Sequence, residues 1–180
     1  MKNALVLFAE GSEELEAITI VNILRRGGIT VTLAGLSIGA LRGSRGTVIL
    51  PDASLDEVLE NNFDMIVLPG GQPGTKHLRA DQRVIHLLQK MAAENRYVTA
   101  ICAAPSVLAA AGLLNGKRAT CFPTCLDEFP EVNVQTDAII EDGKIITSRG
   151  PGTAMDFALL LVERLSNRDN RNTVASGLVR

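Results

Sequence analysis

The sequence of 180 residues has no tryptophan, only one tyrosine and two histidines, and no block of basic residues. Its 18 lysines and arginines stand against 20 aspartates and glutamates, which gives a net charge of −2. A surface that binds nucleic acid needs a basic stripe and aromatic side chains on which bases stack. The composition therefore argues against a nucleic-acid partner.

Long hydrophobic runs are also missing. The opening run, NALVLFA, is short and leads directly into the acidic segment EGSEELE, without the small-residue cleavage site of a signal peptide. The uncharged stretch 98–114 is interrupted by Pro105, and a bilayer span needs about 20 apolar residues. We therefore expect a cytoplasmic protein that does not associate with membranes.

Cysteine is scarce, and its spacing does not suggest a metal or a disulfide framework. The chain has three cysteines, an odd number, and two of them, Cys121 and Cys125, are four residues apart. The histidines, His77 and His86, lie elsewhere, so a zinc site lacks ligands. Residues 68–78, LPGGQPGTKHL, are rich in glycine but lack the Gly-Lys-Ser/Thr ending of a phosphate loop. We expect neither a metal nor a cofactor.

What the sequence does contain is an alternation of short apolar runs with helix-like segments. Apolar runs that are hydrophobic on every residue are typical of parallel strands covered on both faces. The pattern predicts one domain, residues 1–180, with a doubly wound, mostly parallel α/β sheet, helices on both faces and one β-hairpin. The expected strands are 3–9, 30–35, 47–51, 63–71 and 97–102, the hairpin is 136–148, and the expected helices are 13–26, a short one near 54–60, 81–94, a small-residue helix ending near 111, and 151–165.

Cys102 occupies the point where a predicted strand meets a helix. Small residues stand two before it and two after it, at Ala100 and Ala104, and Pro105 suits the first turn of the helix that follows. This arrangement is that of a nucleophile on a sharp turn, where the positive end of the helix would lower the pKa of the thiol. A cysteine in an apolar run is equally well explained as a packed core thiol.

Two further segments fall at carboxyl ends of strands, where such folds place their sites. Glu13, Glu14 and Glu16 begin a helix, where acidic residues offset the helix dipole, and spacing alone does not show which one turns inward. Gly70 and Gly71 either form a plain tight turn or offer backbone N–H groups to an oxyanion.

Four motifs together, AEGSEELEA, LPGGQPG, TAICAAP and TSRGPGTAMDFAL, resemble the ThiJ/PfpI superfamily. The similarity runs through nearly the whole chain and is greatest to the branch of the parkinsonism-associated deglycase and the bacterial YajL-type proteins. It implies a flavodoxin-like sheet, a homodimer, Cys102 as the reactive cysteine and Glu16 as its carboxylate partner. It also implies that Gly70, Gly71 and Ala103 lend backbone N–H groups, and that Arg45 lies near the site at the dimer interface.

One position departs from the family pattern. Many members carry a histidine before the proline that follows the elbow helix, and this chain has Phe122 there, before Pro123. A Cys–His–acid triad is therefore not expected, and neither is protease chemistry.

The resemblance implies two functions that use the same residues. The first is a cysteine-dependent enzyme of carbonyl stress, of the glyoxalase III or protein deglycase type, acting on 2-oxoaldehydes such as methylglyoxal or on their early adducts. The second is a non-enzymatic sensor of oxidative stress, or a redox-responsive chaperone, in which Cys102 reacts with peroxide.

Overall fold

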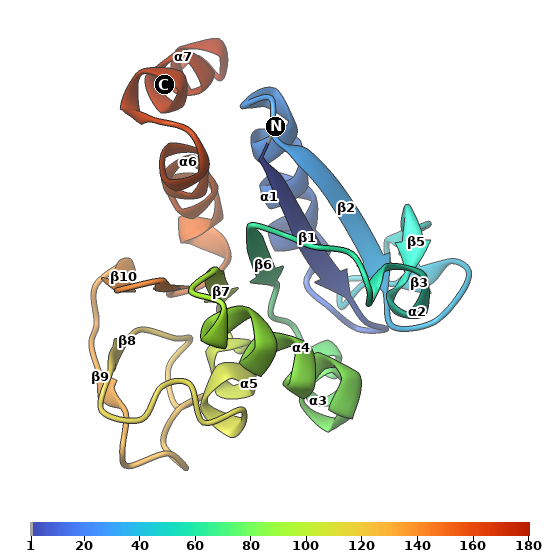
Figure 1. Ribbon diagram of the computed structural model, residues 1–180, viewed down its shortest axis with the longest axis vertical. Coiled ribbons are helices and arrows are strands. Elements are labelled where there is room, and N and C mark those ends of the chain that lie inside the picture. The colour runs from blue at the N-terminus through green and yellow to red at the C-terminus, as the bar shows by residue number, and fades with distance from the viewer. Residues whose placement is uncertain (1) are drawn as a thin grey trace.

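The computed structural model describes residues 2–180, and its centre is a seven-stranded sheet in the order β10-β11-β7-β6-β1-β2-β5 (Figure 1). Neighbouring strands are parallel throughout, except for the antiparallel pair β10 and β11. The strands are β1 (Asn3–Phe8), β2 (Thr30–Gly35), β5 (Ala53–Ser54), β6 (Met65–Leu68), β7 (Tyr97–Ile101), β10 (Ile139–Asp142) and β11 (Ile145–Ser148).

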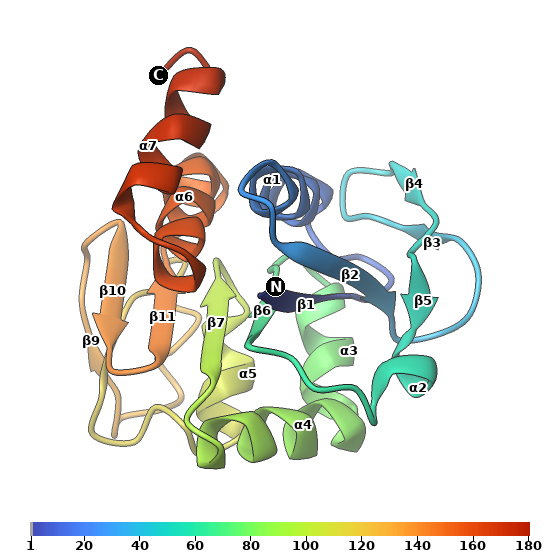
Figure 2. The same cartoon turned by 45° about the horizontal axis from the view of Figure 1, so that its top comes forward.

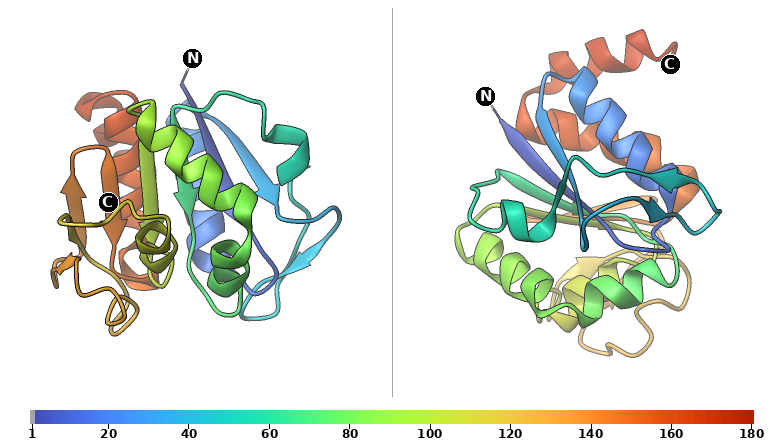
Figure 3. Two further views of the ribbon diagram at one scale, coloured as in Figure 1. Left: turned by 60° about the horizontal axis from the view of Figure 1, so that its bottom comes forward. Right: turned by 90° about the vertical axis from the view of Figure 1, so that its right-hand side faces the viewer.

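Helices cover both faces of this sheet, as predicted (Figures 2 and 3). The alternating residues of β1 explain why: Val6 points into a core shared with one set of helices, and Leu7 points into the core on the other face. The helices on the Val6 face are α1 (Glu14–Arg26), α6 (Ala154–Leu165) and α7 (Arg168–Gly177). Those on the Leu7 face are α2 (Leu55–Val58), α3 (Gly74–Ala80), α4 (Gln82–Ala93) and α5 (Pro105–Ala110).

The structure adds elements that the sequence did not predict. The predicted hairpin is present as β10 and β11, and a second hairpin, which was not predicted, pairs β3 (Leu41–Arg42) with β4 (Val48–Ile49). A short parallel pair joins β8 (Arg118–Ala119) to β9 (Asn133–Val134). Helices α3 and α7 are also additions, and the first turn of the helix predicted over 151–165 is the 3-10 turn η1 (Pro151–Thr153). Within residues 2–180, no helix combines the length and apolar character that crossing a membrane requires.

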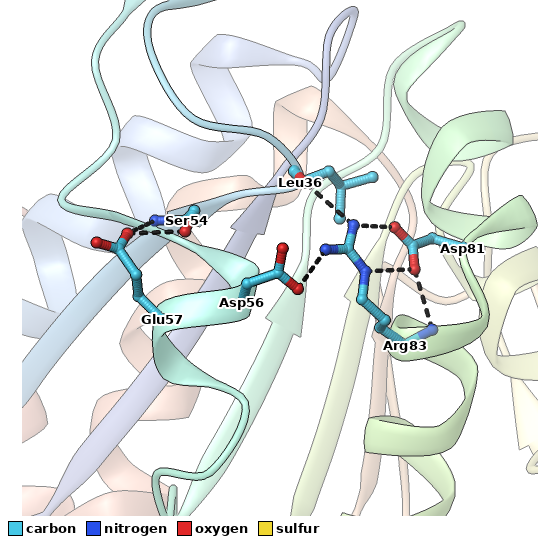
Figure 4. A network of polar contacts seen from close by, with 6 residues as sticks. All are labelled: Leu36, Ser54, Asp56, Glu57, Asp81 and Arg83. Carbon is cyan, nitrogen blue, oxygen red and sulfur yellow. Dashed lines mark hydrogen bonds and ion pairs between the residues drawn. The ribbon is translucent and has the colours of Figure 1, made fainter.

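A polar network joins the start of α4 to α2 and to the end of β2 (Figure 4). The Asp81 carboxylate caps α4 by accepting the Arg83 backbone N–H at 2.9 Å, and it also accepts the Arg83 guanidinium at 2.5 Å. The same guanidinium donates to Asp56 at 2.6 Å and to the Leu36 carbonyl at 3.1 Å. The hydrogen bonds from Arg83 lower the pKa of Asp81, and partial burial raises it. The hydrogen bonds have the larger effect, so the pKa of Asp81 lies below its ordinary value.

Replacing Asp81 by alanine is expected to lower the free energy of unfolding by about 1–2 kcal/mol, because the variant loses a helix cap and an ion pair together. Asp56→Ala is the matched control: its side chain is 70% exposed, so about 0.5 kcal/mol or less should be lost. Urea unfolding of both variants measures this. Equal losses in the two would show that the cap contributes nothing beyond the exposed ion pair.

Candidate functional site

Cys102 lies at the end of β7, where the chain turns sharply into α5. Its backbone has φ of 64°, a left-handed conformation that costs energy for a residue with a Cβ. Its N–H donates to the Ser148 carbonyl at 2.9 Å, and its own carbonyl accepts the Phe122 N–H at 2.8 Å. These two hydrogen bonds hold the strained turn from both sides. The side chain is only 8% exposed, and it lies at the base of an open cavity.

Glu16 brings a carboxyl group to this cysteine from the first turn of α1. The residue is completely buried, and its Oε2 accepts the Gly70 N–H at 2.7 Å. Its Oε1 has no hydrogen-bond partner within residues 2–180. Burial raises the pKa of Glu16 to about 7, against the opposing effects of Gly70 and of the neighbouring Cys102 thiol. A carboxyl group that titrates near neutral pH is suited to taking up and returning a proton.

The carboxyl group in turn changes the acidity of the thiol. Burial, followed by the charge and hydrogen bonding of Glu16, raises the pKa of Cys102 to about 12. The sequence-based expectation of a lowered thiol pKa is therefore wrong, because burial of the thiol, and after it the nearby Glu16 carboxylate, outweigh the positive end of the short helix α5. At pH values between these two pKa values, the pair holds one proton, which lies on the thiol, and Glu16 is a carboxylate that can accept it.

Three backbone N–H groups surround the pair, but they do not all face the same atom. Those of Ala103 and Gly71 point at the Cys102 sulfur and oppose the rise in its pKa. The Gly70 N–H is already donated to Glu16, so the expectation that it serves an oxyanion is wrong. Gly70 has another reason to be glycine, since a Cβ there would lie 2.7 Å from the Cys102 Cβ.

The structure also separates the three glutamates that spacing left open. Glu14 accepts the backbone N–H groups of Arg45 and Thr47, so it fastens the loop after β3 to the start of α1. Burial raises the pKa of Glu14, but these hydrogen bonds outweigh it and hold the pKa below its ordinary value. Glu13 accepts the Ser44 hydroxyl at 2.7 Å. Glu16 is thus the carboxylate directed at the thiol.

The cavity above Cys102 has a volume of about 490 Å³ and is open to solvent. Arg45 lies on its rim with its side chain 80% exposed, 3.7 Å from the Glu13 carboxylate. Phe122 lines the cavity in the place of the family histidine. The full lining is Glu13, Ser44, Arg45, Gly71, Gln72, Cys102, Ala103, Phe122, Pro123, Thr124, Cys125 and Pro151.

Several of these lining residues were not predicted. Gln72, Thr124, Cys125 and Pro151 reach the cavity from loops that follow separate strands. The signal was present in part, because Gln72 lies within the motif LPGGQPG and Pro151 lies within the motif TSRGPGTAMDFAL. No periodicity marks loop residues, so their place at the site comes only from the fold.

The histidines and the remaining polar groups do not complete a different kind of site. His77 contacts the Glu10 carbonyl at 2.9 Å through Nδ1, and His86 lies on α4; neither lines the cavity. In the part of the chain that the structure describes, no group of three histidine, cysteine or acidic side chains is placed to hold a metal ion. The chemistry that this site supports is therefore that of a thiol with a carboxyl partner and two N–H donors.

Comparison with known proteins agrees with the motifs. Residues 2–164 match the model of the DJ-1/PfpI family. The chain is 43% identical to protein dj-1beta of Drosophila melanogaster over 99% of this chain and 97% of the relative. It is 37% identical to the glutathione-independent glyoxalase DJR-1.2 of Caenorhabditis elegans, over 98% and 96% of the two chains.

Solved structures give the same answer. The crystal structure of Drosophila melanogaster DJ-1beta superposes with a TM-score of 0.96 at 42% identity, covering 99% of this chain and 97% of that one. The structure of oxidized Toxoplasma gondii DJ-1 superposes with a TM-score of 0.96 at 35% identity, covering 99% and 98%. The mostly parallel sheet with helices on both faces is thus the fold of these proteins.

Proposed function

The chain belongs to the DJ-1/PfpI family, and from this premise we propose that it is a cysteine-dependent enzyme that converts 2-oxoaldehydes such as methylglyoxal into hydroxy acids. The observation that carries the proposal is the buried Glu16 carboxyl beside Cys102, with its pKa raised to about 7. A relative named as a glutathione-independent glyoxalase supports it.

The first step is addition of the thiol to the aldehyde. The Glu16 carboxylate takes the proton of Cys102 as the sulfur forms a bond to the aldehyde carbon, which removes the barrier set by the high pKa of the thiol. The carbonyl oxygen becomes an alkoxide beside the N–H groups of Gly71 and Ala103. It takes the proton from Glu16 to give a hemithioacetal, which leaves Glu16 as a carboxylate again. Arg45, on the rim, is placed to attract the polar end of the substrate.

The second step moves hydrogen between carbons. Glu16 removes the proton from the former aldehyde carbon and returns it to the neighbouring ketone carbon, while the proton of the hemithioacetal hydroxyl passes to the ketone oxygen. The first carbon is thereby oxidised and the second is reduced. The product is a thioester of lactate on Cys102. Water then cleaves the thioester, and lactate leaves with the thiol restored.

Product formation by the wild-type protein tests the proposal. Methylglyoxal is added in a non-amine buffer, and lactate is followed by NMR with Cys102→Ser as the comparison. Lactate in excess over protein in the wild type alone supports the enzyme. Loss of one methylglyoxal per thiol, without lactate, would show a reactive cysteine and no catalysis.

Two further reactions would use the same site. Repair of early aldehyde adducts on amino groups, the deglycase reaction, needs the same Cys102 attack followed by release of the amine. Reaction of Cys102 with peroxide, in a sensor or redox-responsive chaperone, is favoured by its place in an open cavity and by the solved oxidized relative. The lactate assay separates an enzyme from a sensor.

We further propose that the protein is a single domain over residues 1–180, of which residue 1 lies outside the described residues, and that it is a cytoplasmic homodimer. The outer face of α1 exposes Leu15 and Ile18, and the neighbouring hairpin exposes Val48 and Leu50. A groove of about 560 Å³ runs between α1 and this hairpin. Arg45 belongs to the loop of the same hairpin, so a second copy docked here would approach the catalytic cavity.

Ile18→Glu is therefore expected to convert a particle of twice 19.2 kDa into one of 19.2 kDa, because it places a charge in an apolar interface. Val134→Glu, at a half-exposed apolar side chain on β9, is the matched control and should leave the mass unchanged. Light scattering at micromolar protein measures both. A wild-type protein of monomer mass would contradict the proposal.

A further inference from the structure

Cys125 shares the catalytic cavity with Cys102. Both residues line the same space of about 490 Å³, together with Phe122 and Thr124. Cys125 is partly exposed, and it also borders a second cavity on its other side, which contains Lys76 and Arg79. Cys125 is therefore partly accessible from solvent and borders the same cavity as Cys102. No step of the aldehyde chemistry uses it.

Backbone hydrogen bonds tie the turn that carries Cys125 to Cys102 itself. The Phe122 N–H donates to the Cys102 carbonyl at 2.8 Å, and the Cys125 N–H donates to the Phe122 carbonyl at 3.1 Å. Two backbone hydrogen bonds, both made by Phe122, thus link the backbones of the two cysteines, which lie 23 positions apart in the sequence (125 − 102). Residues 122–129 contain no helix or strand, and Thr124 has a left-handed φ of 72°.

The third cysteine has a different environment. Cys121 is only 4% exposed, and the N–H group of Leu126 lies against its sulfur. Burial raises the pKa of Cys121 to about 11. Cys121 therefore has a structural role, and Cys125 is the thiol that is free to react.

We propose that Cys125 is the resolving thiol for Cys102. A hydroperoxide oxidises Cys102 to the sulfenic acid and is itself reduced to water or an alcohol. The Cys125 sulfur then attacks the Cys102 sulfur, the S–O bond breaks, the oxygen leaves as water with the Cys125 proton, and a Cys102–Cys125 disulfide forms. The proposal rests on Cys102 being the reactive thiol of the proposed function.

The disulfide would stop oxidation at a reversible stage. Sulfinic acid is not reduced by ordinary thiols, whereas a disulfide is. A disulfide needs Cα atoms about 4.4–6.8 Å apart. The turn at Phe122–Thr124, which contains no helix or strand, is the segment that would bring Cys125 to this separation from Cys102. Burial and Asp127 raise the pKa of Cys125, so capture depends on the high local concentration of this thiol and not on an acidic one.

Peptide mass spectrometry after treatment with one equivalent of hydrogen peroxide tests this. Wild type is compared with Cys125→Ser, with Cys125→Ala as a second variant and Cys121→Ser as the matched control, each checked for folding by circular dichroism. In wild type and Cys121→Ser we expect a Cys102–Cys125 disulfide that dithiothreitol reverses. In both Cys125 variants we expect dimedone to trap Cys102 and about tenfold more sulfinic acid to form.

The outcomes separate two failures. If dimedone traps Cys102 in the Cys125 variants but wild type forms sulfinic acid equally fast, or forms a Cys121–Cys125 disulfide instead, the resolving role is overturned while the reactive thiol stands. If neither dimedone nor peroxide modifies Cys102 in any variant, the assignment of the reactive thiol fails, and the proposed function fails with it.

Discussion

Replacing Glu16 by glutamine is expected to lower the rate of lactate formation from methylglyoxal by a factor of about 10²–10⁴, the usual loss when general acid–base help is removed. Glutamine keeps the shape of the side chain, and its carbonyl oxygen still accepts the Gly70 N–H. It cannot carry a proton from one carbon to the next. The loss should therefore fall on kcat, measured by NMR at saturating aldehyde, with Glu94→Gln on the surface as the control.

The same variant should make the thiol more reactive, because Glu16 is itself a cause of the raised pKa of Cys102. Without the carboxylate charge, more thiolate is present at pH 8, and alkylation of Cys102 by iodoacetamide should be faster than in wild type. Loss of lactate formation together with faster alkylation of Cys102 would show that Glu16 is needed for proton transfer and not for the nucleophilicity of the thiol. Lactate formation near the wild-type rate would reduce Glu16 to a buried structural acid and refute the mechanism.

The sequence identified the fold from the simplest signal available, which is the uniform burial of its strands. In β1, residues on both faces are buried, and this is why an unbroken apolar run predicted a covered parallel sheet. The helix within residues 166–180 was not predicted, because that segment has few buried apolar residues. Helix α7 is mostly polar and buries only Val174 and Ala175, so its hydrophobic pattern is too weak to predict it.

The sequence pointed to Cys102 and Glu16, which the structure brings together, but not to the electrostatics of the pair. The small neighbours of Cys102 marked the turn, since a sharp elbow leaves no room for large side chains. Neither the direction of the Glu16 side chain nor the partner of the Gly70 N–H is encoded in spacing. Both depend on β1, β6 and β7 lying side by side, which brings the start of α1, Gly70 and Cys102 together. The raised thiol pKa follows from that juxtaposition.

The burial of Glu16 should also appear in the stability of the protein. A carboxyl group whose pKa is about 7 in the folded state and about 4.5 in the unfolded state binds an extra proton when folded. Between these pH values the folded state is therefore favoured by acid, and stability falls as pH rises. The cost of ionising Glu16 in place reaches roughly 3 kcal/mol above pH 7.

Glu16→Gln removes this cost, so the variant should gain stability relative to wild type as pH rises from 4.5 to 8, by roughly 3 kcal/mol at the upper end. Taking the difference between variant and wild type cancels the other titrating groups. Asp81→Asn is the control: the pKa of Asp81 is lowered, so it is ionised in both states above pH 5, and its difference from wild type should be flat. Urea unfolding at intervals of half a pH unit measures both. A flat difference for Glu16→Gln as well would mean that its carboxyl titrates as a solvated acid does, and the proton relay proposed for this site would lose its physical basis.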